Sequence, residues 1–262
     1  MSSRTTERGE VRWEEWQSSA ESLRIGADEL HLWRVSLDQP AEVYRACLDT
    51  LTPDESQRAG RFHFDRHRQQ FVVARGALRA VLGHYLGRPP GQLRFTYSPF
   101  GKPEVEGEEG PDCLRFNLSH AEGVALIALT RGREVGVDVE AVREEFPGME
   151  IAERFFSERE VETLRAMPEG ARAAAFFLYW TRKEAYIKAL GEGLSHPLRR
   201  FSVSLADGES RVLAEPEGVA HEASEWFVKG VALGASHAAA VAFRGPVTDS
   251  RFRQWRPALL NS

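Results

Sequence analysis

Hydrophobic and polar residues alternate in several short stretches of the chain, a pattern that predicts β-strands with one buried face. The clearest stretch is VGVDVE, residues 135–140, in which three valines alternate with Gly136, Asp138 and Glu140. On a strand the valines face one side and the two carboxylates the other, roughly 7 Å apart. Because like charges at this spacing repel each other, the sequence predicts that a positive group balances them.

Apolar residues at helical spacing predict two long helices, over residues 65–86 and 171–190, each followed by a glycine suited to a helix C-cap. Two short helices are predicted to begin at capping boxes, in which glutamate follows a hydroxyl residue by three positions: Thr52 with Glu55, and Ser157 with Glu160. The predicted strands span residues 28–37, 93–97, 124–130, 134–140, 201–205, 210–213, 224–233 and 237–243. The short turn at residues 131–133 predicts that the strands on either side of it form a hairpin.

The order of a short helix, a long helix and a run of strands occurs twice along the chain. It predicts an α+β fold made of two similar halves packed together. The predicted division is a loose N-terminal tail (1–27) in which Trp13 and Trp16 dock, an N-terminal half (28–145), a C-terminal half (146–245) and a C-terminal tail (246–262).

Composition narrows the class of protein. The chain has 262 residues, 42% of them hydrophobic and 28% charged, which is typical of a soluble globular protein. Its net charge of −5 argues against a nucleic-acid-binding protein. Cys47 and Cys113 fit neither a disulfide framework nor a zinc site, and we expect reduced thiols in a cytoplasmic protein. No long apolar run and no signal-peptide pattern occurs, so neither a membrane span nor secretion is expected.

The predicted positive group is a divalent ion, and the long helix over residues 171–190 could supply a further ligand for it. This helix carries Glu184 and Lys188 four positions apart, with Trp180 one turn earlier and Lys183 next to Glu184. Asp138, Glu140 and Glu184 together could form a set of oxygen ligands for a hard cation such as Mg²⁺.

Each of these signals has an ordinary structural explanation as well. An Asp-x-Glu at the end of a strand is more often solvated or paired with a basic residue. Glu184 and Lys188 could be a simple i,i+4 helix pair, worth about 0.3 kcal/mol. Ser119 and His120 could be a cap and a surface imidazole.

The order of the motifs along the chain is more specific than any one of them. They are GKP (residues 101–103), FNLSH (116–120), VGVDVE (135–140), RFFSERE (154–160) and WTRKEAYIKALGEGL (180–194). This succession resembles the 4′-phosphopantetheinyl transferases of the larger, Sfp type, over residues 51–243. The resemblance implies two α+β halves related by a pseudo-twofold axis, with the active site at their junction.

The resemblance also implies an activity. Family members transfer the 4′-phosphopantetheine arm of coenzyme A to a serine of an apo carrier protein and release 3′,5′-ADP. By this resemblance Asp138, Glu140 and Glu184 bind Mg²⁺ or Mn²⁺. Glu184 is the expected general base, directly or through a water, and Lys188 is expected on the pyrophosphate.

The resemblance extends to the coenzyme A site, with Lys102 along the adenine and His120 near the 3′-phosphate. The full set implied to bind coenzyme A is Arg58, Arg61, Lys102, Pro103, Asn117, Ser119, His120, Asp138, Lys183, Glu184 and Lys188. Further candidate phosphate cations are Arg68, Arg75 and Arg79. Glu55 departs from the pattern, since some members have a basic residue there. Glu160 is expected either to hold a metal-bound water or only to complete its capping box, and Trp180 to lie beside the site.

The expected partner is an acidic apo carrier protein of the acyl, peptidyl or aryl type, and the enzyme is expected to be a monomer. Arg199, Arg200 and the apolar residues of 146–156 are candidate docking positions. Two other classes stay open: a metal-dependent nuclease or phosphatase, and a protein that binds coenzyme A without chemistry. Transfer of the phosphopantetheine arm to an apo carrier would distinguish a transferase from both of these classes.

Overall fold

The computed structural model describes residues 13–15, 23–193, 196–206, 209–214 and 225–260. Trp16, which was predicted to dock, lies outside these ranges. Trp13 packs edge-on against Phe252, with the ring centroids 5.6 Å apart, as predicted.

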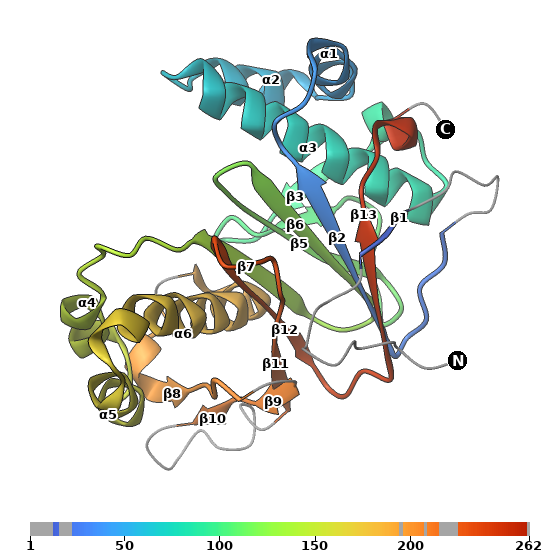
Figure 1. The fold of residues 1–262 in the computed structure, drawn as a ribbon. Coiled ribbons are helices and arrows are strands. Elements are labelled where there is room, and N and C mark those ends of the chain that lie inside the picture. Colours follow the sequence, from blue (N-terminus) through green and yellow to red (C-terminus); the bar gives the residue numbers. More distant parts are fainter. Residues whose placement is uncertain (1–12, 16–22, 194–195, 207–208, 215–224, 261–262) are drawn as a thin grey trace.

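Two β-sheets lie face to face, and helices cover the outer face of each (Figure 1). The first sheet has the order β1 (Glu14–Glu15), β13 (Asp249–Gln254), β2 (Glu29–Ser36), β6 (Val124–Arg131) and β5 (Leu114–Ala121). The second has the order β7 (Val135–Ala141), β12 (His237–Arg244), β11 (Trp226–Gly230) and β9 (Glu209–Arg211). Two small sheets pair β3 (Phe95–Tyr97) with β4 (Pro103–Val105), and β8 (Phe201–Ser202) with β10 (Leu213–Ala214).

Three apolar clusters hold these layers together. Side chains of β2, β6, β7 and β12 form the cluster between the two sheets, and they include the three valines of the VGVDVE strand. A second cluster fills the space between the first sheet and α3 (Asp65–Leu86), and a third lies between the second sheet and α6 (Glu169–Leu190). The valines therefore face the inter-sheet core, and the alternate residues Asp138 and Glu140 lie on the face toward α6, as the alternation predicted.

The helices follow the sequence prediction closely. α3 has the predicted bounds, and α6 begins two residues earlier than predicted, directly after Pro168. Both predicted capping boxes are present, at the starts of α2 (Pro53–Gly60) and α5 (Glu158–Ala166). The other helices are α1 (Ala41–Asp49) and α4 (Gly148–Phe155), with short 3₁₀ turns η1 (Pro90–Gln92), η3 (Leu198–Arg200) and η4 (Pro257–Leu260). In the described ranges no helix combines the length and the apolar composition needed to cross a membrane.

The predicted hairpin of β6 and β7 is wrong. β6 pairs with β2 on one edge and β5 on the other, whereas β7 pairs with β12 in the second sheet. Because both edges of β6 are already occupied, β7 has no place beside it. The change of sheet therefore falls at residues 132–134, earlier than the predicted boundary at Phe146.

The two predicted tails contribute to the first sheet and its core. β13 lies between β1 and β2 and runs parallel to both. Leu23 and Ile25 near one end of the chain, and Trp255 and Leu259 near the other, are buried in the core beside α3. The β13 sequence DSRFRQ has too few apolar residues to indicate a strand, and only its two partners in the sheet reveal its role.

A buried polar network on the α3 side of β2 gives a testable pH dependence. His31 is fully buried, 2.5 Å from the Tyr85 hydroxyl through Nδ1 and 3.1 Å from Glu29 Oε2 through Nε2. Because the carboxylate can only accept, Nε2 carries the proton and Nδ1 accepts from Tyr85. Burial, and then Arg253, lower the pKa of His31 to about 4, so the ring stays neutral in the fold.

We expect this histidine to make the fold acid-sensitive. In the unfolded chain His31 gains a proton near pH 6.5, so the free energy of unfolding falls as pH drops from 6.5 toward 4, by about 3 kcal/mol at the limit. Replacing His31 by Asn should shrink the difference in unfolding free energy between pH 7 and pH 4.5, measured by urea titration. His63→Asn, at an exposed position, is the control; an equal pH difference in wild type and His31→Asn would contradict the prediction.

Candidate active site

A glycine sets the distance between α6 and the acidic strand. A Cβ atom on Gly136 would lie 2.1 Å from the carbonyl oxygen of Ala185 and 2.3 Å from the backbone nitrogen of Ala189. Only glycine therefore lets the backbone of α6 lie directly on β7. This contact fixes the positions of Glu184 and Lys188 along the strand that carries Asp138.

Asp138 is the meeting point of three elements. Its side chain is buried on β7, and its Oδ1 accepts hydrogen bonds from Lys188 Nζ of α6 at 2.5 Å and from Ser119 Oγ of β5 at 3.0 Å. Lys188 also donates to Ser119 Oγ at 3.0 Å. The sequence predicted a divalent ion as the balancing charge; in this structure the Lys188 ammonium contacts Asp138.

The other two carboxylates are electrostatically coupled to Asp138. Burial, and then the charges of Asp138 and Glu140, raise the pKa of Glu184 to about 7, although Lys188 opposes the shift. Burial and Asp138 also raise the pKa of Glu140, against the opposing effects of Lys188, Arg143 and a hydrogen bond from Trp180. The three carboxylates thus lie close enough to resist one another's ionisation. Trp180 lies beside the site, as expected.

Two oxygens of this cluster suit a cation. Asp138 Oδ2 and Glu184 Oε1 are buried and have no hydrogen-bond partner among the described residues. Buried carboxylate oxygens without a donor are costly, and hard divalent cations prefer oxygen ligands. In the described part of the chain, however, no three or more His, Cys, Asp or Glu side chains gather as a ready-made metal site, so the set of three ligands stays a prediction. The Lys188 ammonium donates a hydrogen bond to Asp138 Oδ1, the other oxygen of that carboxylate.

The FNLSH motif joins the two sheets at their adjoining edges. The backbone N–H of Val137 on β7 donates to Asn117 Oδ1 at 2.9 Å, and the N–H of Val139 donates to Ser119 Oγ at 3.4 Å. Side-chain oxygens on β5 thereby replace the backbone acceptors that a neighbouring strand would supply. Asn117 was predicted to bind coenzyme A. Its side-chain oxygen instead accepts from Val137 in the contact between β5 and β7, where it has a structural role.

His120 follows Ser119 on β5, and its side chain is exposed. Burial of part of its ring lowers its pKa, and so do the charges of Lys188, Arg58 and His67. These four groups therefore share one region, although they come from β5, α6, α2 and α3. Such a gathering of basic side chains can hold an anion. Arg61 follows α2 as its C-cap and is exposed, with its guanidinium 3.4 Å from Gln57 Oε1.

The prediction that Lys183 touches phosphate is wrong. Its side chain is fully buried, pairs with Glu160 Oε2 at 2.7 Å, and donates to the carbonyls of Leu198 and Phe201 at 3.0 and 2.6 Å. Adjacent residues on a helix point about 100° apart, so Lys183 and Glu184 face different surroundings. Glu160 completes the capping box and accepts from the Val203 N–H at 2.9 Å, which supports its structural explanation.

Glu55 accounts for two of the further candidate cations. It is buried and forms ion pairs with Arg75 and with Arg79, the latter at 2.7 Å. Both arginines are therefore held by Glu55 within the fold, although one carboxylate offsets only one of the two positive charges, and Arg68 pairs with Asp65 at 2.6 Å. Where some family members have a basic residue, this chain therefore has Glu55, which pairs with two arginines of α3.

Pro103 begins β4, and Lys102 is the last residue of the loop before it. Lys102 pairs with Glu134 Oε2 at 2.7 Å and donates to the carbonyl of Ala189 at 2.9 Å, so its ammonium does not project freely toward a ligand. The sequence alone did not single out Glu134, or the close approach at Gly136, because nothing in their local sequence reveals a partner more than thirty residues away.

Two family models match consecutive parts of the chain. Residues 33–131 match the model described as "4'-phosphopantetheinyl transferase, N-terminal", and residues 134–242 match the model described as "4'-phosphopantetheinyl transferase superfamily". The break between them coincides with the change from the first sheet to the second, after β6.

Individual relatives agree with these models. The chain is 42% identical to 4'-phosphopantetheinyl transferase HetI from Nostoc sp., over 74% of this chain and 81% of the relative. It is 28% identical to 4'-phosphopantetheinyl transferase Sfp from Bacillus subtilis, over 69% and 79%. It is also 28% identical to human L-aminoadipate-semialdehyde dehydrogenase-phosphopantetheinyl transferase, over 75% and 68%. The chain therefore belongs to the 4′-phosphopantetheinyl transferase superfamily and is a phosphopantetheinyl transferase.

Proposed function

We propose that this enzyme transfers the 4′-phosphopantetheine arm of coenzyme A to a serine of an apo carrier protein, in a magnesium-dependent reaction that releases 3′,5′-ADP. The observation that carries the proposal is the cluster of Asp138, Glu140 and Glu184 beside Lys188, at the junction of β7 and α6, in a chain of this family. Phosphoryl-group chemistry depends on positioning and on charge stabilisation, and these residues offer both.

The carboxylates fit a divalent ion by their chemistry. Asp138, Glu140 and Glu184 would hold Mg²⁺ or Mn²⁺, and the buried oxygens of Asp138 and Glu184 without hydrogen-bond donors support this assignment. When bound, the ion would neutralise negative charge on the pyrophosphate. It would also remove the mutual repulsion that raises the pKa of Glu184 and Glu140.

The basic and acidic side chains have separate tasks in this proposal. Lys188 binds a pyrophosphate oxygen, for which its compact ammonium is suited. Glu184 accepts the proton of the carrier serine as its oxygen attacks the β-phosphorus, directly or through a water. Burial and the neighbouring carboxylates raise the pKa of Glu184 to about 7 in this structure, whereas a divalent ion bound to Glu184 would lower that pKa and make it a weaker base.

The nucleotide end of coenzyme A is proposed to lie against the basic groups around His120. His120, Arg58 and Arg61 would face the 3′-phosphate, and Ser119 would have to turn its hydroxyl proton away from Asp138 to donate to a phosphate. Lys102 and Pro103 would border the adenine with their apolar atoms. Lys183 is left out of the proposed set because its ammonium is buried against Glu160, whereas Asn117 could contribute only its amide nitrogen, since its side-chain oxygen accepts from Val137.

A carrier protein is proposed to dock on the C-terminal half. A pocket of about 330 Å³ lies there, at the starts of α4 and α6, but its lining includes four glutamates: Glu144, Glu145, Glu150 and Glu169. An acidic carrier would be repelled by that rim. Arg199 and Arg200 on η3 are exposed and offer the opposite charge. We propose that one monomer carries the whole site.

The direct test is incubation with coenzyme A, Mg²⁺ and a panel of apo acyl, peptidyl and aryl carriers, followed by intact mass measurement. A gain of one phosphopantetheine arm on a carrier serine is the expected result. Hydrolysis of phosphate esters without any transfer would favour a metal-dependent hydrolase. Binding of coenzyme A that is indifferent to Mg²⁺, without transfer, would favour a binding protein.

Replacing His120 by Ala should mainly raise the KM for coenzyme A, by about tenfold, with a smaller change in kcat. The comparison substrate is dephospho-coenzyme A, which lacks the 3′-phosphate. If His120 contacts this group, the variant should lose little further when the phosphate is removed. An undiminished penalty for dephosphorylation in the variant would place the contact elsewhere.

A further inference from the structure

The C-terminal end of α6, which carries Lys188, is held by a side chain from a distant hairpin. Lys102, in the loop between β3 and β4, donates to the carbonyl oxygen of Ala189 at 2.9 Å. Its ammonium also pairs with Glu134 Oε2 at 2.7 Å, immediately before β7 begins. One side chain thus ties together the hairpin of the first half, the start of the acidic strand and the end of the helix.

The contact meets a need of the helix terminus. The last four carbonyls of an α-helix have no partner within the helix, and its C-terminal end carries a partial negative charge. The Lys102 ammonium supplies a donor for the Ala189 carbonyl and a positive charge beside the negative end of the helix. α6 ends at Gly191, whose φ of +73° turns the chain, and a Cβ there would lie 3.3 Å from Lys102 Cδ. The stem of Lys102 therefore packs against the end of the helix as well.

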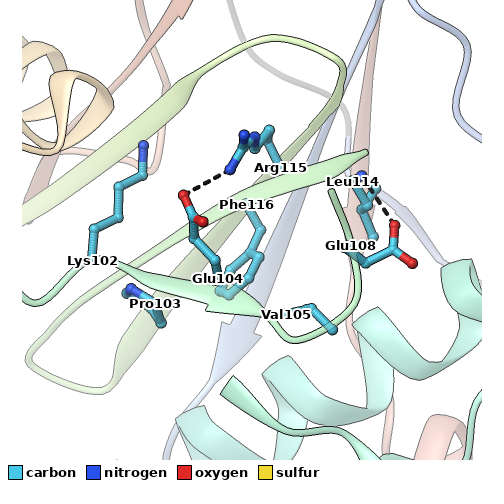
Figure 2. A pocket seen from close by; sticks show the side chains of 8 residues that line it. All are labelled: Lys102, Pro103, Glu104, Val105, Glu108, Leu114, Arg115 and Phe116. Atoms are coloured by element: carbon cyan, nitrogen blue, oxygen red, sulfur yellow. Dashed lines mark hydrogen bonds and ion pairs between the residues drawn. The ribbon is translucent and has the colours of Figure 1, made fainter. Parts of the chain in front are cut away.

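Further ion pairs hold the lysine in place. On β5, Arg115 Nε lies 3.4 Å from Glu134 Oε1. Its Nη1 lies 2.7 Å from Oε1 of Glu104 on β4. Figure 2 shows the Glu104 carboxylate directed at Arg115. We call Lys102, Glu104, Arg115, Glu134 and the Ala189 carbonyl the junction clasp.

The junction clasp is a structural contact rather than a ligand pocket. The cavity that its residues help to line in Figure 2 has a volume of only about 10 Å³, room for about one water molecule. The Lys102 side chain is only 10% exposed. Its partner Glu134 is 34% exposed, so the ion pair is only partly shielded from solvent, and the hydrogen bond to the Ala189 carbonyl adds a second constraint on the ammonium.

We infer that Lys102, held by Glu134, is a positioning residue for the transfer reaction. It acts through α6: by fixing the Ala189 carbonyl it fixes the adjacent Lys188, whose ammonium must reach both Asp138 and the pyrophosphate. This inference rests on the proposed function of Lys188. Small displacements of a charge-stabilising group slow a reaction without weakening the binding of the remote parts of the substrate.

The test compares Lys102→Met, which keeps the stem and removes the charge, with Lys102→Arg and Glu134→Gln. Lys102→Met should lower kcat about tenfold with less than a twofold change in the KM for coenzyme A. Lys102→Arg should keep at least half of the wild-type kcat. The double variant Lys102→Met/Glu134→Gln should be no more than twofold slower than Lys102→Met, because the pair acts as a unit.

A second readout does not depend on transfer. In Lys102→Met, the backbone amides of the last turn of α6, from Lys188 to Gly191, should exchange with deuterium about tenfold faster than in the wild-type protein. The control is Arg88→Met, which removes a cation from the exposed pair with Glu108 and should change neither readout.

Three outcomes would overturn the inference. Unchanged exchange in Lys102→Met shows that the clasp does not hold the helix end. A raised KM with unchanged kcat shows that Lys102 acts on the nucleotide instead. A fall in kcat that Arg88→Met reproduces shows a general charge effect. If wild-type protein modifies no carrier, the proposed function fails and the positioning role with it, whereas the exchange data still decide whether the clasp exists.

Discussion

Replacing Asp138 by Asn should lower the rate of phosphopantetheine transfer by roughly 10³-fold while the protein stays folded. The substitution keeps the shape of the side chain and an acceptor for Ser119, and removes the charge that Lys188 contacts at 2.5 Å. It also removes a charge that raises the pKa of Glu184, so the two effects are linked through one residue. The measurement is initial transfer rate at saturating coenzyme A over a Mg²⁺ titration, with circular dichroism as the check on folding.

Glu42→Gln is the matched control, because it removes an exposed carboxylate from α1 and should leave the rate unchanged. If Asp138→Asn retains more than a tenth of the wild-type rate at saturating Mg²⁺, Asp138 is not a ligand of the ion. A loss of rate accompanied by loss of the folded signal would show only that Asp138 supports the fold.

Replacing Gly136 by Ala should damage both stability and catalysis. The added Cβ would overlap the backbone of Ala185 and Ala189, so α6 has to move away from β7. We expect the free energy of unfolding to fall by about 3 kcal/mol, and the kcat of the folded fraction to fall by about 10²-fold because Glu184 and Lys188 move with the helix. Urea titration and transfer assays corrected for the folded fraction measure the two effects separately.

Gly170 offers the control, since it lies in the first turn of the same helix and a Cβ there would meet no atom within 4 Å. Gly170→Ala should raise the free energy of unfolding by about 0.5 kcal/mol and leave kcat unchanged. The close-packing argument fails if Gly136→Ala is as stable and as active as Gly170→Ala.

Periodicity predicted the elements that bury a continuous face. The bounds of α3 were predicted to the residue, because its apolar spacing begins after an extended segment and ends at Gly87 in the left-handed conformation. The two capping boxes were recognisable for a similar reason: all their partners lie within four residues. Local patterns of this kind are complete in the sequence and need no tertiary information.

The roles of charged residues were harder to predict from the sequence, because their partners lie far away along the chain. Lys183 and Lys188 occupy the same motif, yet Lys183 is buried against Glu160 and Lys188 meets Asp138. Arg75 and Arg79 were candidate phosphate cations, but both form ion pairs with Glu55. Charge type alone could not tell a binding residue from a buried ion pair, since both use the same side chains.

By itself, the sequence determined the α+β class, the long helices, the face on which Asp138 and Glu140 lie, and the helix that brings Glu184 and Lys188. Each follows from a period or a cap contained within a few turns of chain. Only the tertiary structure decided that β7 leaves the first sheet, that β13 enters it, and that Lys102 holds the end of α6. These features depend on which strand edges are free and on which distant groups meet, and such contacts are determined by packing of the whole chain rather than by any local pattern.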